Sequence, residues 1–498
     1  MASPMDIVDT ILKLVELGEE IHKRYKMYIG SEADLGELDT RIRAGLMVLE
    51  VFGKVIERGI GGLLYRHQEA IILLLGHLQG VFDRLDKQLS RFPRDEKLSI
   101  ISKLRWTFKG KSGYEAVLQE MADWRREVHD VVDAMKLLQE DENDEDRVLY
   151  KQLFEVCGGP GVRSADAMDA VRRGRGDLSE PPALEENELK SLNSGNNLRD
   201  GNRVILKGKS TFVECRYSEA RSPEEIQESI ADVKILAAVL GKVDAPAMHI
   251  LRCRGTLYQG DGFDRSLLFY EVPREPTTQS PWTLAQAIED KRTMKPSLDA
   301  RIRNAVEICT AVMFTHSAGL VHKSIQPENI LILNSSRSND SVLGKSAYLA
   351  GFDAARLRDL SAYSAQRAET DPLRRLYQHP ERQLAQSDGK VVRFGIRHDM
   401  YSLGVVLLEL AMWRRVAQIA DPELQKLRGA RGQAFDARRL QAKLVELVRQ
   451  SFAGLTGPRY AGAVLCCLQD SVVSHKDERE MREMFYERVL QPLKQIAV

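Results

Sequence analysis

Apolar residues in the first 157 positions recur every three to four residues, which is the spacing of one face of an α-helix. Ser3, Pro4 and Asp6 form a helix start signal, with a capping residue, a proline at the first helical position and an acid in the first turn. The expected buried face of this first helix is Ile7, Ile11, Leu14, Gly18, Ile21, Tyr25 and Ile29. A second helix is expected after Ser31, with Leu38, Ile42, Leu46, Leu49 and Val55 in register.

Three further helical segments complete this half of the chain. A third helix is expected from about Gly62 to Phe92, and its run Ala70–Leu78 is apolar nearly all round, which predicts burial at the centre of a bundle. A fourth, from Tyr114 to Leu138, carries Val117, Met121, Trp124, Val128, Val131 and Met135 at helical spacing. A fifth piece, Asp146–Val156, follows an acidic run and is placed to brace the others. The pattern predicts an all-α four-helix bundle with a brace helix over residues 1–157.

The pattern changes after Cys157. Residues 158–201 contain GGPG, RRGRGD, SEPP and NSGNN with few large apolar side chains, which is typical of a flexible linker. From 202 to 498 the chain first shows short strand-like runs, VILKG, TFVECRY and LLFYEV, and then long helical patterns from about Ser297 onwards. This order predicts an α+β domain with a sheet-containing lobe followed by a helical lobe.

Composition narrows the class of protein. Hydrophobic residues make up 43% of the 498 positions, so each domain has enough apolar mass for a core. Lys plus Arg equal Asp plus Glu at 72 each, so no global field favours nucleic acid, and no nucleic-acid partner is expected. The amino terminus carries no targeting signal, and no apolar run reaches the roughly 18 residues of a spanning helix. A cytoplasmic protein is therefore expected. The cysteines fit reduced core positions: Cys157, Cys215, Cys253, Cys309, Cys466 and Cys467.

The segment Val321–Leu333, VHKSIQPENILIL, resembles the catalytic loop of protein kinases. Four residues match that signature: His322, Pro327, Glu328 and Asn329. The position of the catalytic aspartate holds Ser324, and that of the following lysine holds Gln326. Neither a hydroxyl nor an amide is a useful base near neutral pH, so the proton acceptor is lost.

Other landmarks follow in kinase order. Gly351, Phe352 and Asp353 stand where a kinase carries Asp, Phe and Gly, so the metal-binding carboxylate is replaced by Gly351. His379, Pro380 and Glu381 stand at the family's Ala-Pro-Glu, and Asp399 opens a hydrophobic helix, Arg397–Trp413. The resemblance implies a bilobal protein-kinase-like fold of the degenerate, pseudokinase type. It also implies that Glu381 pairs with Arg459 and that Asp399 tethers the catalytic-loop backbone.

The resemblance places Arg216, at the end of TFVECRY, where kinases have the lysine that grips nucleotide phosphates. Asp232 stands where the partner glutamate is expected, and Glu228, one turn earlier, is the alternative partner. Arg216, Asp232 and Asn329 are thus the candidate nucleotide-binding residues. No glycine-rich phosphate loop precedes this strand. Efficient phosphoryl transfer is not expected; weak ATP binding stays open, and a magnesium site is not expected.

The segment between Asp353 and His379 corresponds by resemblance to the kinase activation segment. Its candidate phosphorylation sites are Ser361, Tyr363, Ser364, Thr370 and Tyr377, with Arg367, Arg374 and Arg375 available to pair an added phosphate. The alternative is a polar surface loop without regulation.

A basic stretch lies between the third and fourth expected helices. Residues 87–111 carry eight Lys or Arg against two acids, interleaved with Phe92, Trp106 and Phe108. Such a stretch suits an anionic membrane surface, with Lys103, Arg105, Lys109 and Lys111 as candidate lipid contacts. A solvated loop that tucks its aromatics onto the bundle explains the same pattern.

The order of helical bundle, linker and pseudokinase resembles the mixed-lineage-kinase-domain-like effectors of necroptosis, and the bundle resembles fungal HeLo and HeLo-like cell-death domains. The resemblance implies a pseudokinase that restrains a bundle effector in cell death or immune signalling. An upstream kinase or sensor, anionic membrane lipid and further copies of the chain on activation are the implied partners. Two alternatives are a divergent ATP-binding kinase with residual activity and a soluble scaffold that binds only proteins.

Overall fold

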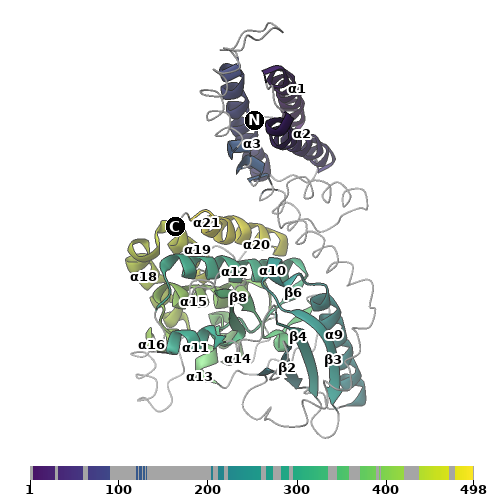
Figure 1. Ribbon diagram of the computed structural model, residues 1–498. Helices are drawn as coiled ribbons and strands as arrows, with labels where there is room; N and C mark the ends of the chain where they lie inside the picture. The colour runs from purple at the N-terminus through teal and green to yellow at the C-terminus, as the bar shows by residue number, and fades with distance from the viewer. Residues whose placement is uncertain are drawn as a thin grey trace. The chain divides into compact units, whose positions relative to one another are not determined.

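The computed structural model divides the chain into two compact units, Met1–Asp166 and Ala167–Val498 (Figure 1). It describes residues 4–28, 32–59, 65–89, 119–121, 123–125, 127–128, 131, 203–205, 211–217, 222–259, 265–272, 282–290, 295–334, 345–357, 371–387, 392, 394–419, 437–469 and 477–496. The expected linker 158–201 and brace helix 146–156 lie outside these residues. Each unit has its own hydrophobic core.

The first unit is helical, as the periodicity predicts. Helix α1 spans Pro4–Tyr28, α2 spans Glu32–Gly59 and α3 spans Tyr65–Leu89. The start signal at Pro4 and the start of α2 just after Ser31 are therefore confirmed. The expected face of α1 is buried at Ile7, Ile11, Leu14 and Ile21. Residues of the expected fourth helix that the structure describes are helical, and Met121, Trp124 and Val128 lie in the same core.

Trp124 joins this fourth segment to α3. Its ring is fully buried, and its indole N–H donates to the carbonyl oxygen of Leu74 over 2.9 Å. Because a buried indole N–H needs a partner, this bond fixes the segment against one place on α3.

Helix α3 is not buried all round, so the prediction of a central helix is wrong. Its core face contains Ile71, Leu74, Leu75 and Leu78, at the spacing of a single helical stripe. Leu73 is 71% exposed and Ile72 42% exposed. Helix α3 has more apolar residues than its core-facing side can bury, so Ile72 and Leu73 lie on the solvent-facing side.

The first described elements of the second unit include a four-stranded antiparallel sheet in the order β1-β2-β4-β3. Its strands are β1 (Arg203–Ile205), β2 (Thr211–Tyr217), β3 (Arg252–Gln259) and β4 (Arg265–Glu271). Helix α9, Pro223–Gly241, packs against β3, and Ser222 caps it by accepting from the amide of Glu225. Figure 1 shows α9 beside this sheet.

Long helices make up most of the rest of the second unit that the structure describes. Helix α12 (Leu298–Ser317) starts after its capping residue Ser297, as expected, and α15 (Ile396–Met412) is buried along nearly its whole length. Helix α19 (Pro458–Leu468) packs against both α15 and α18 (Ala437–Thr456). The chain closes with α20 (Glu478–Phe485), the π-helical turn η5 (Tyr486–Leu490) and α21 (Gln491–Lys494).

Short elements connect the sheet to the helices. Strands β5 (Trp282–Thr283), β7 (Ile330–Asn334) and β8 (Lys345–Leu349) form one small antiparallel sheet, and β6 (Leu320–Val321) pairs with β9 (Arg356–Leu357). Two 3₁₀ turns, η2 (Pro327–Asn329) and η3 (Phe352–Ala354), follow β6 and β8. The remaining helices among the described residues are α10 (Ala245–Met248), α11 (Leu284–Glu289), α13 (Pro372–Arg375), α14 (Pro380–Ser387) and α16 (Val416–Ile419).

Across the part of the chain that the structure describes, no helix combines the length and the apolarity needed to cross a membrane.

Candidate functional site

Asp399, near the start of α15, holds the backbone of the loop 321–333. Its carboxylate is fully buried and accepts from the amides of His322 at 2.7 Å and Lys323 at 2.9 Å, and it lies 3.1 Å from Nε2 of His316. Lys323 has a φ of 68°, a left-handed conformation that a non-glycine residue adopts at a cost. The two bonds to Asp399 hold this strained residue in place, so the tether expected of Asp399 is present.

His322 links this loop to the segment after β8. Its Nδ1 accepts from the amide of Ser324 at 3.3 Å, so its Nε2 carries the proton and donates to the carbonyl of Ala350 at 3.1 Å. Its ring packs edge-on against Phe352, with the ring centroids 4.6 Å apart. His322 is therefore a neutral structural residue that positions Phe352.

Ser324 and Asn329 are engaged with each other. The side-chain nitrogen Nδ2 of Asn329 donates to Oγ of Ser324 at 2.7 Å and also to the carbonyl oxygen of Ser324. Asn329 is 2% exposed, and Gln326 between them is 7% exposed. Ser324 and Asn329 thus close the loop 321–333 on itself.

Gly351 begins a tight turn, Gly351–Ala355, that contains η3; we call it the Gly-Phe-Asp turn. Its φ of 91° lies in the left-handed region, which glycine adopts without a steric cost. The amides of Gly351 and Phe352 both donate to the carboxylate of Glu214, the latter over 3.0 Å. Glu214 comes from the middle of β2 and is fully buried.

Sequence reasoning did not single out Glu214. The available signal was a carboxylate in the centre of the strand TFVECRY, two residues before Arg216 and therefore on the same face of the sheet. Charged residues are almost never buried unless they are paired, so an acid in a buried strand indicates a partner.

Arg216 does not form the expected ion pair with Asp232. It is 9% exposed, and its guanidinium donates to the carbonyl of Ala355 at 3.4 Å. Asp232 is half-buried on α9, and Glu228, the alternative partner, is exposed. The reason for the difference is that Arg216 lies against the Gly-Phe-Asp turn.

The expected pair of Glu381 and Arg459 is also replaced. Glu381 binds Arg397 with an N–O distance of 2.6 Å, and Arg459 donates to the carbonyl of Gln495 over 2.8 Å. Arg397 is the second residue of α15 and lies beside Glu381 of α14, so it reaches the carboxylate first.

His379, Glu381 and His398 each offer one possible metal-ligand atom, and these atoms lie within 4.8 Å of one another. The donor set does not fit a metal ion. Nδ1 of His398 accepts from the amide of Gly395, and Nδ1 of His379 accepts from the amide of Glu381. Both rings therefore carry their proton on Nε2, and in His398 this nitrogen lies 3.4 Å from the carboxylate of Glu381. Burial first, and then neighbouring His379, Arg397 and Arg382, lowers the pKa of His398 to about 2, so it stays neutral.

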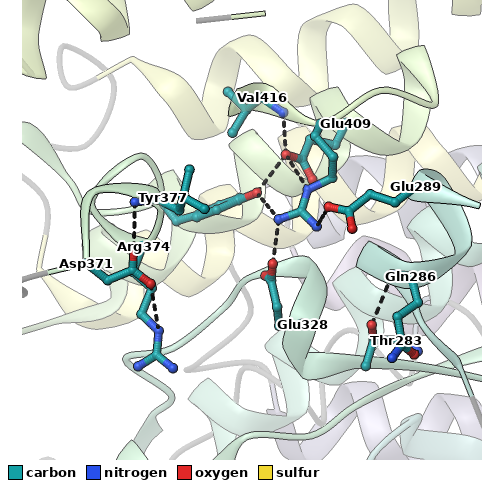
Figure 2. A network of polar contacts seen from close by, with 11 residues as sticks. Thr283, Gln286, Glu289, Glu328, Asp371, Arg374, Tyr377, Glu409 and Val416 are labelled. Atoms are coloured by element: carbon teal, nitrogen blue, oxygen red, sulfur yellow. Dashed lines mark hydrogen bonds and ion pairs between the residues drawn. The ribbon is translucent and has the colours of Figure 1, made fainter. Parts of the chain in front are cut away.

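A second polar cluster surrounds Arg415, just before α16 (Figure 2). Arg415 reaches Glu289 at 2.9 Å, Glu328 at 2.5 Å and Glu409 at 3.5 Å. We call Arg415, these three acids and Tyr377 the Arg415 cluster. It joins η2 of the loop 321–333 to α11 and α15.

Tyr377 is part of this cluster and is not an accessible phosphorylation site. Its hydroxyl donates to Glu409 at 2.6 Å, and its side chain is 5% exposed. Burial first, and then Glu409, raises its pKa well above the ordinary value. Burial likewise raises the pKa of Glu409 to about 7, against the opposing effect of Arg415.

Of the other residues expected to act in regulation or lipid binding, the structure describes Arg374 and Arg375. Arg374 pairs with Asp371 at an N–O distance of 3.8 Å, and Arg375 is half-buried. Ser361, Tyr363, Ser364, Arg367 and Thr370 lie outside the described residues, as do Lys103, Arg105, Lys109 and Lys111.

Comparison with known proteins adds no assignment: no family model matches the chain, and no curated protein matches it.

Proposed function

We propose that this protein is a catalytically defective, protein-kinase-like regulator joined to a helical-bundle effector of cell death or immune signalling. In this proposal the four-stranded sheet with α9 is the small lobe of a bilobal kinase-like domain, and the helices from α12 onwards are the large lobe. The observation that carries it is the scaffold around Asp399 and His322, which is intact while Ser324 and Gly351 stand at the base and metal positions.

Two contacts support the loss of phosphoryl transfer. Arg216 donates to the carbonyl of Ala355, and the side-chain amide of Asn329 donates to Oγ of Ser324. A general base contributes about 10²- to 10⁴-fold to such a reaction, and here no carboxylate stands at its position. These contacts argue against the alternative of an active, divergent kinase.

Nucleotide binding is the first test. The full-length protein is heated with and without ATP and Mg²⁺, and incorporation of phosphate from ATP is measured in parallel. We expect no Mg²⁺-dependent thermal stabilisation and no phosphate transfer. Mg²⁺-dependent stabilisation by ATP that Arg216→Ala abolishes would support the active-kinase alternative instead.

Membrane binding by the bundle is the second test. Fragment 1–157 is mixed with vesicles that contain anionic lipid, and with neutral vesicles, at physiological salt. We expect leakage only from anionic vesicles, and loss of leakage when Lys103, Arg105, Lys109 and Lys111 are changed to Gln. The matched control changes four exposed basic residues of the described helices, Lys13, Lys23, Arg43 and Lys54, and should leak like the wild type.

A fragment that neither binds nor leaks anionic vesicles would contradict the membrane part of the proposal. Recovery of one stable protein partner without any dependence on lipid would then favour the soluble scaffold.

A further inference from the structure

Strand β2 presents two opposite charges to the Gly-Phe-Asp turn. Successive residues of a strand point to opposite faces, so Glu214 and Arg216 share one face while Val213 and Cys215 share the other. Val213 and Cys215 are buried in an apolar cluster with residues of β4. The charged face is therefore turned away from that cluster and toward the turn.

The two charges bind opposite ends of the turn. Glu214 accepts from the amides of Gly351 and Phe352 at its start, and Arg216 donates to the carbonyl of Ala355 at its end. A helical turn leaves N–H groups without partners at its start and C=O groups at its end. Glu214 accepts from the N–H groups at the start of the turn, and Arg216 donates to a C=O group at its end.

Burial makes the contact of Glu214 hard to replace. The side chain is fully buried, and an ionised carboxylate away from water needs strong donors. Hydrogen bonds from backbone amides to a carboxylate are charge-assisted and roughly twice as strong as neutral ones. Burial first, and then Glu214, raises the pKa of Tyr270 well above its ordinary value.

We infer that Glu214 and Arg216 form an internal clamp, which holds the four-stranded sheet on the Gly-Phe-Asp turn and occupies its amides with the chain's own carboxylate. This inference deepens the proposed function, on which it rests, by naming what takes the place of a nucleotide and metal between the two lobes. A regulator of the domain therefore has to compete with Glu214 or act at another surface.

Hydrogen exchange tests the clamp in the full-length protein. Peptides that cover residues 349–356 are followed by mass spectrometry in the wild type, in Glu214→Gln and in Glu214→Ala. We expect the amides of Gly351 and Phe352 to be protected in the wild type although they lie in a turn. Exchange should become about tenfold faster or more in Glu214→Gln, since an amide group supplies one acceptor oxygen instead of two.

The matched control is Glu271→Gln on neighbouring β4, where the side chain is exposed. It should leave exchange at 349–356 unchanged. Arg216→Gln should accelerate exchange less than Glu214→Gln does, because it releases one carbonyl and no amide. If Glu214→Ala does not fold, Glu214→Gln, which keeps the side-chain volume, and the wild-type protection still decide the matter.

Wild-type amides at 351–352 that exchange like an exposed loop would overturn the clamp, as would equal exchange in the wild type and Glu214→Gln. The outcome is separable from the proposed function. Mg²⁺-dependent phosphate transfer would overturn the proposed function. The clamp would still hold if the amides of Gly351 and Phe352 were protected in the wild type and exchanged faster in Glu214→Gln.

Discussion

At the scale of single residues, Glu409 is the buried acid whose protonation most directly affects the Arg415 cluster. Its pKa is raised to about 7 by burial, whereas an unfolded chain would hold this group near 4.5. Above pH 4.5 the unfolded state releases this proton, while the folded state keeps it until about pH 7. Stability contributed by Glu409 is therefore complete below pH 4.5 and falls as pH rises to about 7, then stays level.

Glu409→Gln should remove this pH dependence. The thermal midpoint is measured for the wild type and for the variant at each pH. The advantage of the wild type over the variant should decrease between pH 5 and pH 7, and the corresponding loss in free energy of unfolding should be at most about 3 kcal/mol. The charged groups facing Glu409 are Arg415 and Glu328, with Tyr377 hydrogen-bonded to it. Glu446→Gln, at an exposed position on α18, is the control, and its difference from the wild type should not vary with pH. A constant difference for Glu409→Gln would show that another group carries the dependence.

Residue roles were the part of the site that the sequence predicted least well. Motif order correctly placed Asp399 against the loop 321–333, because that contact is between backbone amides and one carboxylate at a fixed point of the pattern. The partners of Arg216 and Glu381 were wrong because a long charged side chain can reach several groups, and spacing along the chain does not choose among them.

At the scale of secondary-structure elements, glycines decide how closely helices approach. A Cβ atom at Gly18 of α1 would lie 2.5 Å from Leu46 of α2 and 3.0 Å from the ring of Phe82 of α3. Real Cβ atoms essentially never lie within 3.0 Å of another atom, so Leu46 would have to shift, and Phe82, at the edge of that limit, would have to give by a few tenths of an ångström. Gly18 therefore permits α1 to contact both partner helices at one level.

Gly18→Ala should lower the free energy of unfolding of the first unit by about 1 to 3 kcal/mol, the range for overpacking a core. Gly76→Ala on α3 is the matched control, because nothing lies within 4 Å of its Cβ position. It should stabilise by about 0.5 to 1 kcal/mol through helix propensity alone. Urea unfolding followed by circular dichroism measures both; an equal gain in stability from the two changes would be inconsistent with close packing at Gly18.

The helices and strands that the sequence predicted correctly are those with a regular spacing of apolar residues. The starts of α1, α2 and α12 agree with the predicted positions, and Ser297 caps α12. Strand β3 was not predicted, because its sequence, RCRGTLYQ, mixes arginines and a glycine with few large apolar residues, and a register shift between Cys253 and Gly255 interrupts its pairing. Such a strand is stabilised by its neighbours β4 and α9 rather than by its own composition.

At the scale of the whole molecule, the two units have separate cores, so each should unfold in its own transition. Trp124→Phe and Phe452→Leu are large-to-smaller changes in the first and second core, at side chains that are both fully buried. Trp124→Phe also removes the bond to the carbonyl of Leu74. Each should lower the midpoint of one transition, with a cost of about 1 to 3 kcal/mol.

Differential scanning calorimetry of the full-length protein measures both midpoints. Each variant is the control for the other, because the transition of the unaltered unit should stay within error of the wild type. A single transition that both variants shift equally would contradict independent cores.

The pairing of a left-handed glycine with a buried acid has a consequence for how this sequence can diverge. A relative that loses the acid at position 214 leaves two buried backbone donors at positions 351 and 352 without an acceptor, and a relative that gains a side chain at 351 strains the turn the acid binds. Substitutions at these distant positions should therefore be inherited together, as a correlated pair across homologous sequences.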